Sequence, residues 1–151
     1  MLSPSLEDYL EELYRFSLTY NNVRVTDISK KLKVSLPSVT KALHKLKAGE
    51  YIMYQRYGLI KLTEKGKQMG SFLVTRNNLI QKFIALICPD CDSAAEAEAI
   101  EHYLSKAAIN SFQNMLSFMQ NNPEVYQRYL KYIRSQSGLK TLEKNEQSES
   151  P

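Results

Sequence analysis

Between residues 26 and 62 the sequence passes from helical to strand periodicity in a fixed order. Thr26 can cap a short helix over 27–32, in which Ile28 and Leu32 share one face. After a tight connection, Ser35 caps a second helix that ends at Gly49. The inward residues of this second helix are Val39, Leu43 and Leu46. The pattern predicts two short helices joined by a tight turn.

Strand-forming residues follow this helix pair directly. The run Tyr51–Tyr57 is rich in β-branched and aromatic side chains, Gly58 permits a turn, and Leu59–Leu62 forms a second short strand. A helix pair followed by a two-stranded hairpin is the arrangement of a winged helix-turn-helix. In that fold the second helix enters the major groove of DNA and the hairpin, or wing, contacts the backbone or the minor groove.

The rest of the chain is predicted to be helical, which makes the fold mainly α. A first helix over 5–20 precedes the helix pair, and Thr63 caps a long helix that runs to Ile87, before Pro89. Ser93 and Glu96 form a capping-box pattern that opens a helix to about Ala107. Two further helices are expected over 109–120 and 124–134. We divide the chain into a winged helix-turn-helix domain (1–67), a helical domain (68–135) and a polar tail without regular structure (136–151).

Positive charge is concentrated in the first of these domains. Residues 21–67 contain eleven Lys and Arg against three acids, whereas residues 68–151 contain eight against nine. A basic block beside a near-neutral remainder indicates a nucleic-acid-binding face. Hydroxyl, Lys and His side chains are suited to phosphate and base-edge contacts. The candidate DNA-binding residues are Thr26, Ser35, Ser38, Thr40, Lys41, His44, Lys45, Arg56 and Lys61.

Two groups of acidic residues have the spacing of metal ligands. Asp8 and Glu11 lie three residues apart on the first helix, so their carboxylates project from one face. Glu98, Glu101 and His102 fall at i, i+3 and i+4 on a later predicted helix. Four carboxylates and one imidazole would suit Mn²⁺ or Fe²⁺ better than a metal that prefers thiolates.

The motifs together resemble a known family. The stretch Val25-Thr-Asp-Ile-Ser, then Leu32, Val34-Ser-Leu-Pro-Ser-Val-Thr-Lys41, Leu46, Tyr51-Ile, Tyr54 and Leu62-Thr-Glu-Lys-Gly66, is similar to the diphtheria toxin repressor family. The likeness is greatest to its short branch, the manganese transport regulators, and spans roughly residues 4–133. It implies an N-terminal DNA-binding domain followed by a helical dimerisation domain.

The resemblance also implies a metal-dependent mechanism. Asp8, Glu11, Glu98, Glu101 and His102 match ligand positions of the family, in which metal holds the first helix against the helical domain. Two recognition helices of a homodimer are then held near one helical turn of double-stranded DNA apart. The expected function is a repressor of divalent-metal uptake genes that uses Mn²⁺ or Fe²⁺. Asn77 stands where the family has a further histidine ligand, and because an amide oxygen is neutral, the sequence leaves open whether one ion binds or two.

Other functions are less compatible with the sequence. It contains no nucleophile–base pair and no glycine-rich phosphate loop, so neither an enzyme nor a small organic substrate is expected. Cys88 and Cys91 suit a loop at a helix break better than a zinc or redox site. No apolar run is long enough for a membrane span and no secretory signal is apparent, which favours the cytoplasm. The alternatives are a winged-helix regulator that has lost metal sensing and a helical protein–protein adaptor. The sequence does not identify the operator or the target genes.

Overall fold

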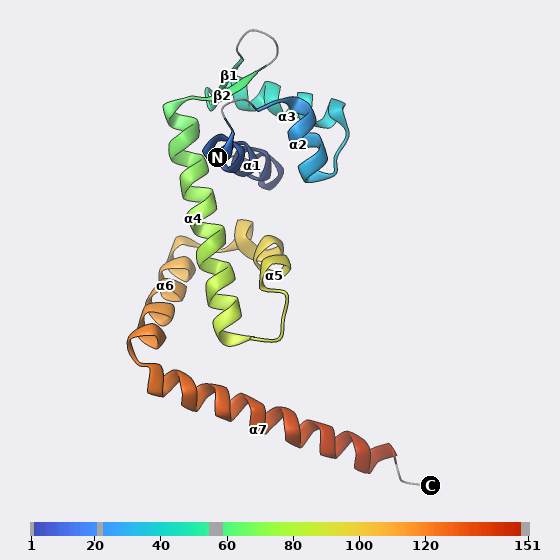
Figure 1. The fold of residues 1–151 in the computed structure, drawn as a ribbon, viewed down its shortest axis with the longest axis vertical. Helices are drawn as coiled ribbons and strands as arrows, with labels where there is room; N and C mark the ends of the chain where they lie inside the picture. Colours follow the sequence, from blue (N-terminus) through green and yellow to red (C-terminus); the bar gives the residue numbers. More distant parts are fainter. Residues whose placement is uncertain (1, 21–22, 55–58, 149–151) are drawn as a thin grey trace. The chain divides into compact units, whose positions relative to one another are not determined.

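The computed structural model describes residues 2–20, 23–54 and 59–148 (Figure 1). These residues form mainly α-helices with a two-stranded antiparallel sheet, so the predicted fold class is confirmed. The chain separates into two compact units, residues 1–104 and 105–151. The first unit continues to residue 104, because the fourth helix packs along the first. The predicted division into domains at residue 67 stays a prediction. The two units are considered separately below.

The N-terminal helices surround one apolar core. Helix α1 spans Pro4–Thr19, α2 spans Val25–Leu32 and α3 spans Leu36–Ala48. The core combines residues from all three helices with residues of the sheet and the fourth helix. Its fully buried members include Leu10, Leu13, Ile28, Leu43, Leu46 and Leu73. The short helix pair is therefore fixed by burial of its apolar faces rather than by helix propensity.

Capping residues explain where the two helices of the pair begin. The Ser35 hydroxyl accepts a hydrogen bond from the Ser38 backbone N–H at 3.3 Å, as predicted. The prediction that Thr26 caps α2 is wrong, because α2 begins at Val25 and Thr26 lies inside it. The Asp27 carboxylate instead accepts a hydrogen bond from the Arg24 backbone N–H at 2.9 Å, which satisfies the amide at the helix start.

The wing consists of β1 (Ile52–Tyr54) and β2 (Ile60–Leu62), which pair in antiparallel register with Ile52 opposite Leu62. Tyr51 and Leu59, which were predicted to belong to the strands, lie outside them, and residues 55–58, including Arg56 and Gly58, lie outside the described residues. Val23 forms a bridge to Ile60 on the other side of β2, which attaches the wing to the helices.

Helix α4 (Glu64–Ile87) connects the wing to the rest of the first unit. The Thr63 hydroxyl accepts a hydrogen bond from the Gly66 backbone N–H at 3.0 Å and donates to the Glu50 carbonyl at 2.7 Å, so the predicted cap also ties α4 to the end of α3. A Cβ on Gly70 would lie 2.5 Å from the Tyr14 Cβ. Only glycine allows this close approach of α4 to α1.

The segment after α4 differs from the prediction. Helix α5 spans Ser93–Ile100 and is capped by Asp92, whose carboxylate accepts hydrogen bonds from the amides of Ala94 and Ala95. The predicted Ser93 capping box is therefore wrong, because Asp92 is the N-cap and Ser93 is already the first residue of the helix. The helix also ends at Ile100 rather than near Ala107. It continues as a short 3₁₀ helix, η2 (Glu101–Tyr103).

The second unit contains α6 (Lys106–Asn121), capped by Ser105, and α7 (Pro123–Ser148). Helix α7 continues beyond Arg134 into the segment expected to lack regular structure. Helix α6 leaves Met115 and Phe118 exposed, and α7 leaves Tyr132 exposed. No described helix has the length and apolar character needed to cross a membrane.

Candidate metal centre and nucleic-acid face

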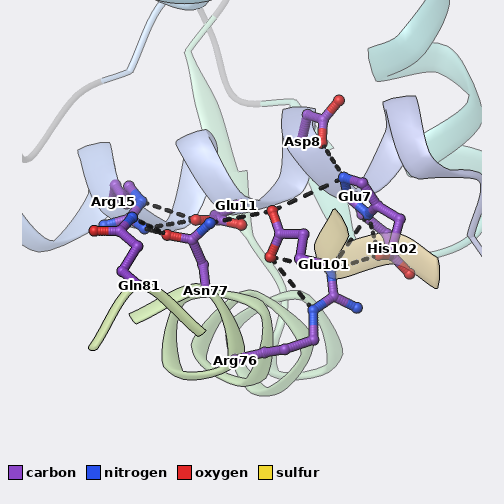
Figure 2. Close-up of polar contacts among 9 residues, drawn as sticks. All are labelled: Glu7, Asp8, Glu11, Arg15, Arg76, Asn77, Gln81, Glu101 and His102. Atoms are coloured by element: carbon purple, nitrogen blue, oxygen red, sulfur yellow. Dashed lines mark hydrogen bonds and ion pairs between the residues drawn. The ribbon is translucent and has the colours of Figure 1, made fainter. Parts of the chain in front are cut away.

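Three predicted metal ligands meet between α1 and η2. Ligand atoms of Asp8, Glu101 and His102 all lie within 4.8 Å of one another. The His102 Nε2 atom is 2.9 Å from the Asp8 Oδ1 atom and 3.8 Å from the Glu101 Oε1 atom (Figure 2). The predicted convergence of the first helix with the Glu101–His102 segment is present in the fold. We refer to these three residues as the ligand triad.

The two carboxyl groups of the triad have limited access to solvent. Glu101 is 1% exposed, and burial, together with the nearby negative charge of Glu11, raises the pKa of its carboxyl group. Burial likewise raises the pKa of Asp8, and Glu98 adds to that shift. Carboxylates in such a position are stabilised by a cation, which is the condition for a metal site.

Two residues that the sequence analysis did not single out complete this end of the cluster. The Glu7 Oε2 atom lies 2.9 Å from the Nδ1 atom of His102 and 2.9 Å from the Nη2 atom of Arg76. The Nη2 atom of Arg76 also lies 3.4 Å from the Oε2 atom of Glu101. Burial lowers the pKa of His102, but the Glu7 hydrogen bond and the charges of Asp8, Glu101 and Glu7 outweigh it and raise the pKa.

The contact with Glu7 orients the imidazole of His102. Because Nδ1 is bound to Glu7, Nε2 is directed toward Asp8 and Glu101. Metal-binding histidines are commonly oriented in this way, by a carboxylate on the nitrogen that does not bind metal. The sequence offered no specific signal for Glu7 or Arg76, because their contacts join residues far apart in the chain.

Glu11 and Asn77 lie at the other end of the cluster, where other residues bind them. Glu11 is buried and forms an ion pair with Arg15, with 2.6 Å between Oε1 and Nη2. Asn77 is 3% exposed; its Nδ2 atom donates to the Glu101 Oε1 atom at 3.2 Å, and its Oδ1 atom accepts a hydrogen bond from Gln81 at 2.6 Å. The Asn77 side chain therefore faces the cluster, but its oxygen already accepts a hydrogen bond from Gln81.

Glu98 is exposed on α5 and is not part of the triad. The predicted sharing of one helical face by Glu98, Glu101 and His102 requires a continuous α-helix. The chain instead tightens into η2 at Glu101, which changes the directions of the later side chains. Glu98 remains near enough to influence the charge of Asp8.

The triad has the chemistry of a divalent-metal site. Two carboxylates and one imidazole suit Mn²⁺, Fe²⁺ or Zn²⁺, and the imidazole is oriented by Glu7. Cys88 and Cys91 lie just beyond the C-terminal end of α4, where both are free thiols and Cys88 is exposed. The triad residues therefore fit a bound ion with oxygen and nitrogen donors.

The predicted DNA-binding residues lie on the surface of the helix pair and the wing. All of them that the structure describes are exposed: Thr26, Ser35, Ser38, Thr40, Lys41, His44, Lys45 and Lys61. The outer side of α3 forms a shallow depression whose lining includes Thr40, Lys41, His44 and Lys45. Arg56 lies outside the described residues. The basic and hydroxyl side chains of α3 are therefore available to a groove of DNA.

Two family models together match most of the chain. Residues 1–60 match the iron dependent repressor N-terminal DNA-binding domain, and residues 63–129 match the iron dependent repressor metal-binding and dimerisation domain. The chain belongs to the iron-dependent repressor family. It is a metal-dependent DNA-binding transcriptional repressor and not an enzyme, in agreement with the prediction from sequence.

Individual relatives are consistent with this assignment. The HTH-type transcriptional regulator MntR of Listeria welshimeri is 39% identical over 125 residues, which cover 82% of this chain and 88% of the relative. MntR of Bacillus pumilus is 37% identical over 125 residues, covering 82% and 87%. The solved structure of the manganese regulator SloR matches with a TM-score of 0.67 and 26% identity. That match covers 78% of this chain but 55% of the SloR chain.

Proposed function

We propose that this repressor controls genes for divalent-metal uptake and that Mn²⁺ is its activating ion, with Fe²⁺ as the alternative. The relatives named MntR and the manganese regulator SloR support manganese. The observation that carries the proposal is the triad of Asp8, Glu101 and His102, which brings two carboxylates and an imidazole together between two elements of the fold. Such a donor set suits Mn²⁺ and Fe²⁺.

In this proposal Asp8, Glu101 and His102 hold the ion. The ion would supply positive charge to the buried carboxylate of Glu101 and to the partly buried carboxylate of Asp8. Asp8 belongs to α1, whereas the other two ligands belong to η2, so binding would join the two elements. Glu98 is proposed as an additional outer carboxylate because its charge acts on Asp8. Glu11 and Asn77, also predicted as ligands, are engaged by neighbouring side chains.

The proposed DNA contacts lie on α3 and the wing. Lys41, Lys45 and Lys61 would contact phosphates, and His44 would donate to a base edge. Two copies of the chain would bind an operator with two half-sites, joined through the matched metal-binding and dimerisation domain. We place this activity in the cytoplasm, where a bacterial repressor meets its operators.

The test is DNA binding as a function of metal. An operator is first selected from a pool of random duplexes in the presence of Mn²⁺. Fluorescence anisotropy is then measured with Mn²⁺, with Fe²⁺ under anaerobic conditions, with Zn²⁺ and with chelator alone. We expect Mn²⁺ or Fe²⁺ to tighten binding at least tenfold. Equal binding with chelator would instead indicate a regulator that does not sense metal, and no DNA binding at any salt concentration would favour an adaptor.

A further inference from the structure

The polar cluster between α1 and α4 has two ends, and among the described residues only one of them brings three possible ligand atoms together. At one end lies the triad, with Glu7 and Arg76 beside it (Figure 2). At the other end lie Glu11 and Asn77. Glu101 joins the two ends, because its Oε1 atom accepts a hydrogen bond from the Asn77 amide.

A guanidinium group fills the second end. Arg15 donates two hydrogen bonds to the Oε1 atom of Glu11, from Nε at 3.1 Å and from Nη2 at 2.6 Å. The same Nη2 atom is 3.3 Å from the Oδ1 atom of Asn77. A single permanent cation therefore contacts both residues that would have to hold an ion at this end. Arginine keeps its charge at every physiological pH.

The Asn77 side chain has no remaining capacity for a metal. An amide oxygen has two acceptor positions, and here Arg15 and Gln81 occupy both. The atom facing Arg15 must be the oxygen, because a guanidinium can only donate hydrogen bonds. The Asn77 nitrogen is correspondingly turned toward Glu101, where it satisfies a carboxylate oxygen.

We infer that Arg15 is a built-in cation that takes the place of a second metal ion, so that the repressor responds to a single ion at the triad. This inference rests on the proposed metal site. Glu11 is neutralised by Arg15 before any metal binds, and the Arg15–Asn77 contact already links α1 to α4. A second ion would have to displace the guanidinium from a buried carboxylate and from an amide that lacks a negative charge.

The inference is tested by counting bound ions. Purified protein treated with chelator is dialysed against Mn²⁺, and the bound metal is measured for wild type, Asn77→His, Arg15→Met and the double variant Arg15→Met/Asn77→His. Methionine keeps the apolar stem of Arg15 and removes its charge. We expect one ion per subunit in wild type and in Asn77→His, and two in the double variant. The matched control is Lys82→Met/Asn77→His, which removes an exposed cation of the same helix as position 77 and should bind one ion.

Thermal unfolding of the metal-free protein gives an independent readout. Arg15→Met should lower the melting temperature in chelator, because it leaves Glu11 buried without its partner. Adding Glu11→Gln to Arg15→Met should restore part of the loss, whereas Lys82→Met should have little effect.

The remaining outcomes refute either the assignment of Arg15 or the proposed metal site. Two tight ions in the wild type or in Asn77→His, or a single ion in the double variant, would overturn the assignment of Arg15. If no variant bound Mn²⁺, the proposed metal site would fail instead. The role of Arg15 would then be decided by the melting temperatures in chelator, where equality of Arg15→Met with wild type would overturn it.

Discussion

Replacement of Glu101 by glutamine isolates the charge of the most deeply buried ligand of the triad. Glutamine has nearly the same volume and keeps an oxygen that can accept the hydrogen bond from Asn77. Arg76 loses its 3.4 Å contact with Glu101 but keeps Glu7 at 2.9 Å. We therefore expect the stability of the metal-free protein to change by no more than about 1 kcal/mol.

The effect on metal binding should be much larger. Two unit charges separated by about 4 Å interact by about 4 kcal/mol at an effective dielectric constant near 20. Arg76 and His102 already neutralise part of the Glu101 charge, so we reduce the expected loss to about 3 kcal/mol. This corresponds to a roughly hundredfold weaker affinity for Mn²⁺.

Isothermal titration of chelator-treated protein with Mn²⁺ measures this loss, and anisotropy with operator DNA shows whether the metal response is lost with it. Glu98→Gln is the matched control, because Glu98 is exposed on α5 and lies outside the triad. Its effect should be less than about tenfold. The reasoning would be wrong if Glu101→Gln retained the affinity of the wild type, or if Glu98→Gln lost as much affinity as Glu101→Gln.

Three further predictions concern DNA, packing and pH. Lys41→Ala should weaken binding to operator and random DNA alike and reduce the salt slope by about 1, whereas His44→Ala should alter sequence preference; equal losses on both DNAs for His44→Ala would exclude base reading. Gly70→Ala should destabilise the protein by about 1–3 kcal/mol in urea unfolding, because its Cβ would overlap Tyr14, and unchanged stability would contradict that contact. The raised pKa of His102 means that its ion pairs stabilise the metal-free fold fully below pH 6.5 and are lost as the pH rises through the raised value. Because Mn²⁺ competes with that proton, its affinity, measured by titration at several pH values, should increase over the same range, and a pH-independent affinity would exclude His102 as a ligand.

Local signals predicted the helices of the first unit well. Ser35 and Thr63 cap their helices because each hydroxyl accepts a hydrogen bond from an amide three residues later, and this depends on sequence neighbours alone. The same kind of reasoning failed at Ser93. Asp92 is an equally good capping residue one position earlier, and the amide positions of the folded helix decide between them.

The candidate site was predicted only in part. Asp8, Glu101 and His102 were identified from their spacing and from the resemblance, and the fold brings them together. The conversion of α5 to η2 at Glu101 was not predicted, because a single tightened turn has no clear sequence signature. The contacts of Arg15 and Arg76 were also missed. They join residues 62 and 69 positions apart, as in Arg15–Asn77 and Glu7–Arg76, and no local pattern reports such pairs.

We expect the close contact between Gly70 and Tyr14 to act as a pivot about which α4 can tilt. Gly70 has no side chain, so the side chain of Tyr14 packs directly against the backbone of α4 and holds the two helices close together at this point. Gly70 lies about midway between Glu64, at the wing end of α4, and Asn77. Each of the two is about 10 Å from Gly70 at the usual helical rise. We therefore expect a displacement of about 1 Å at Asn77 to reach the wing with comparable amplitude and opposite direction. The occupancy of the cluster would in this way affect the position of the hairpin that we propose to contact DNA.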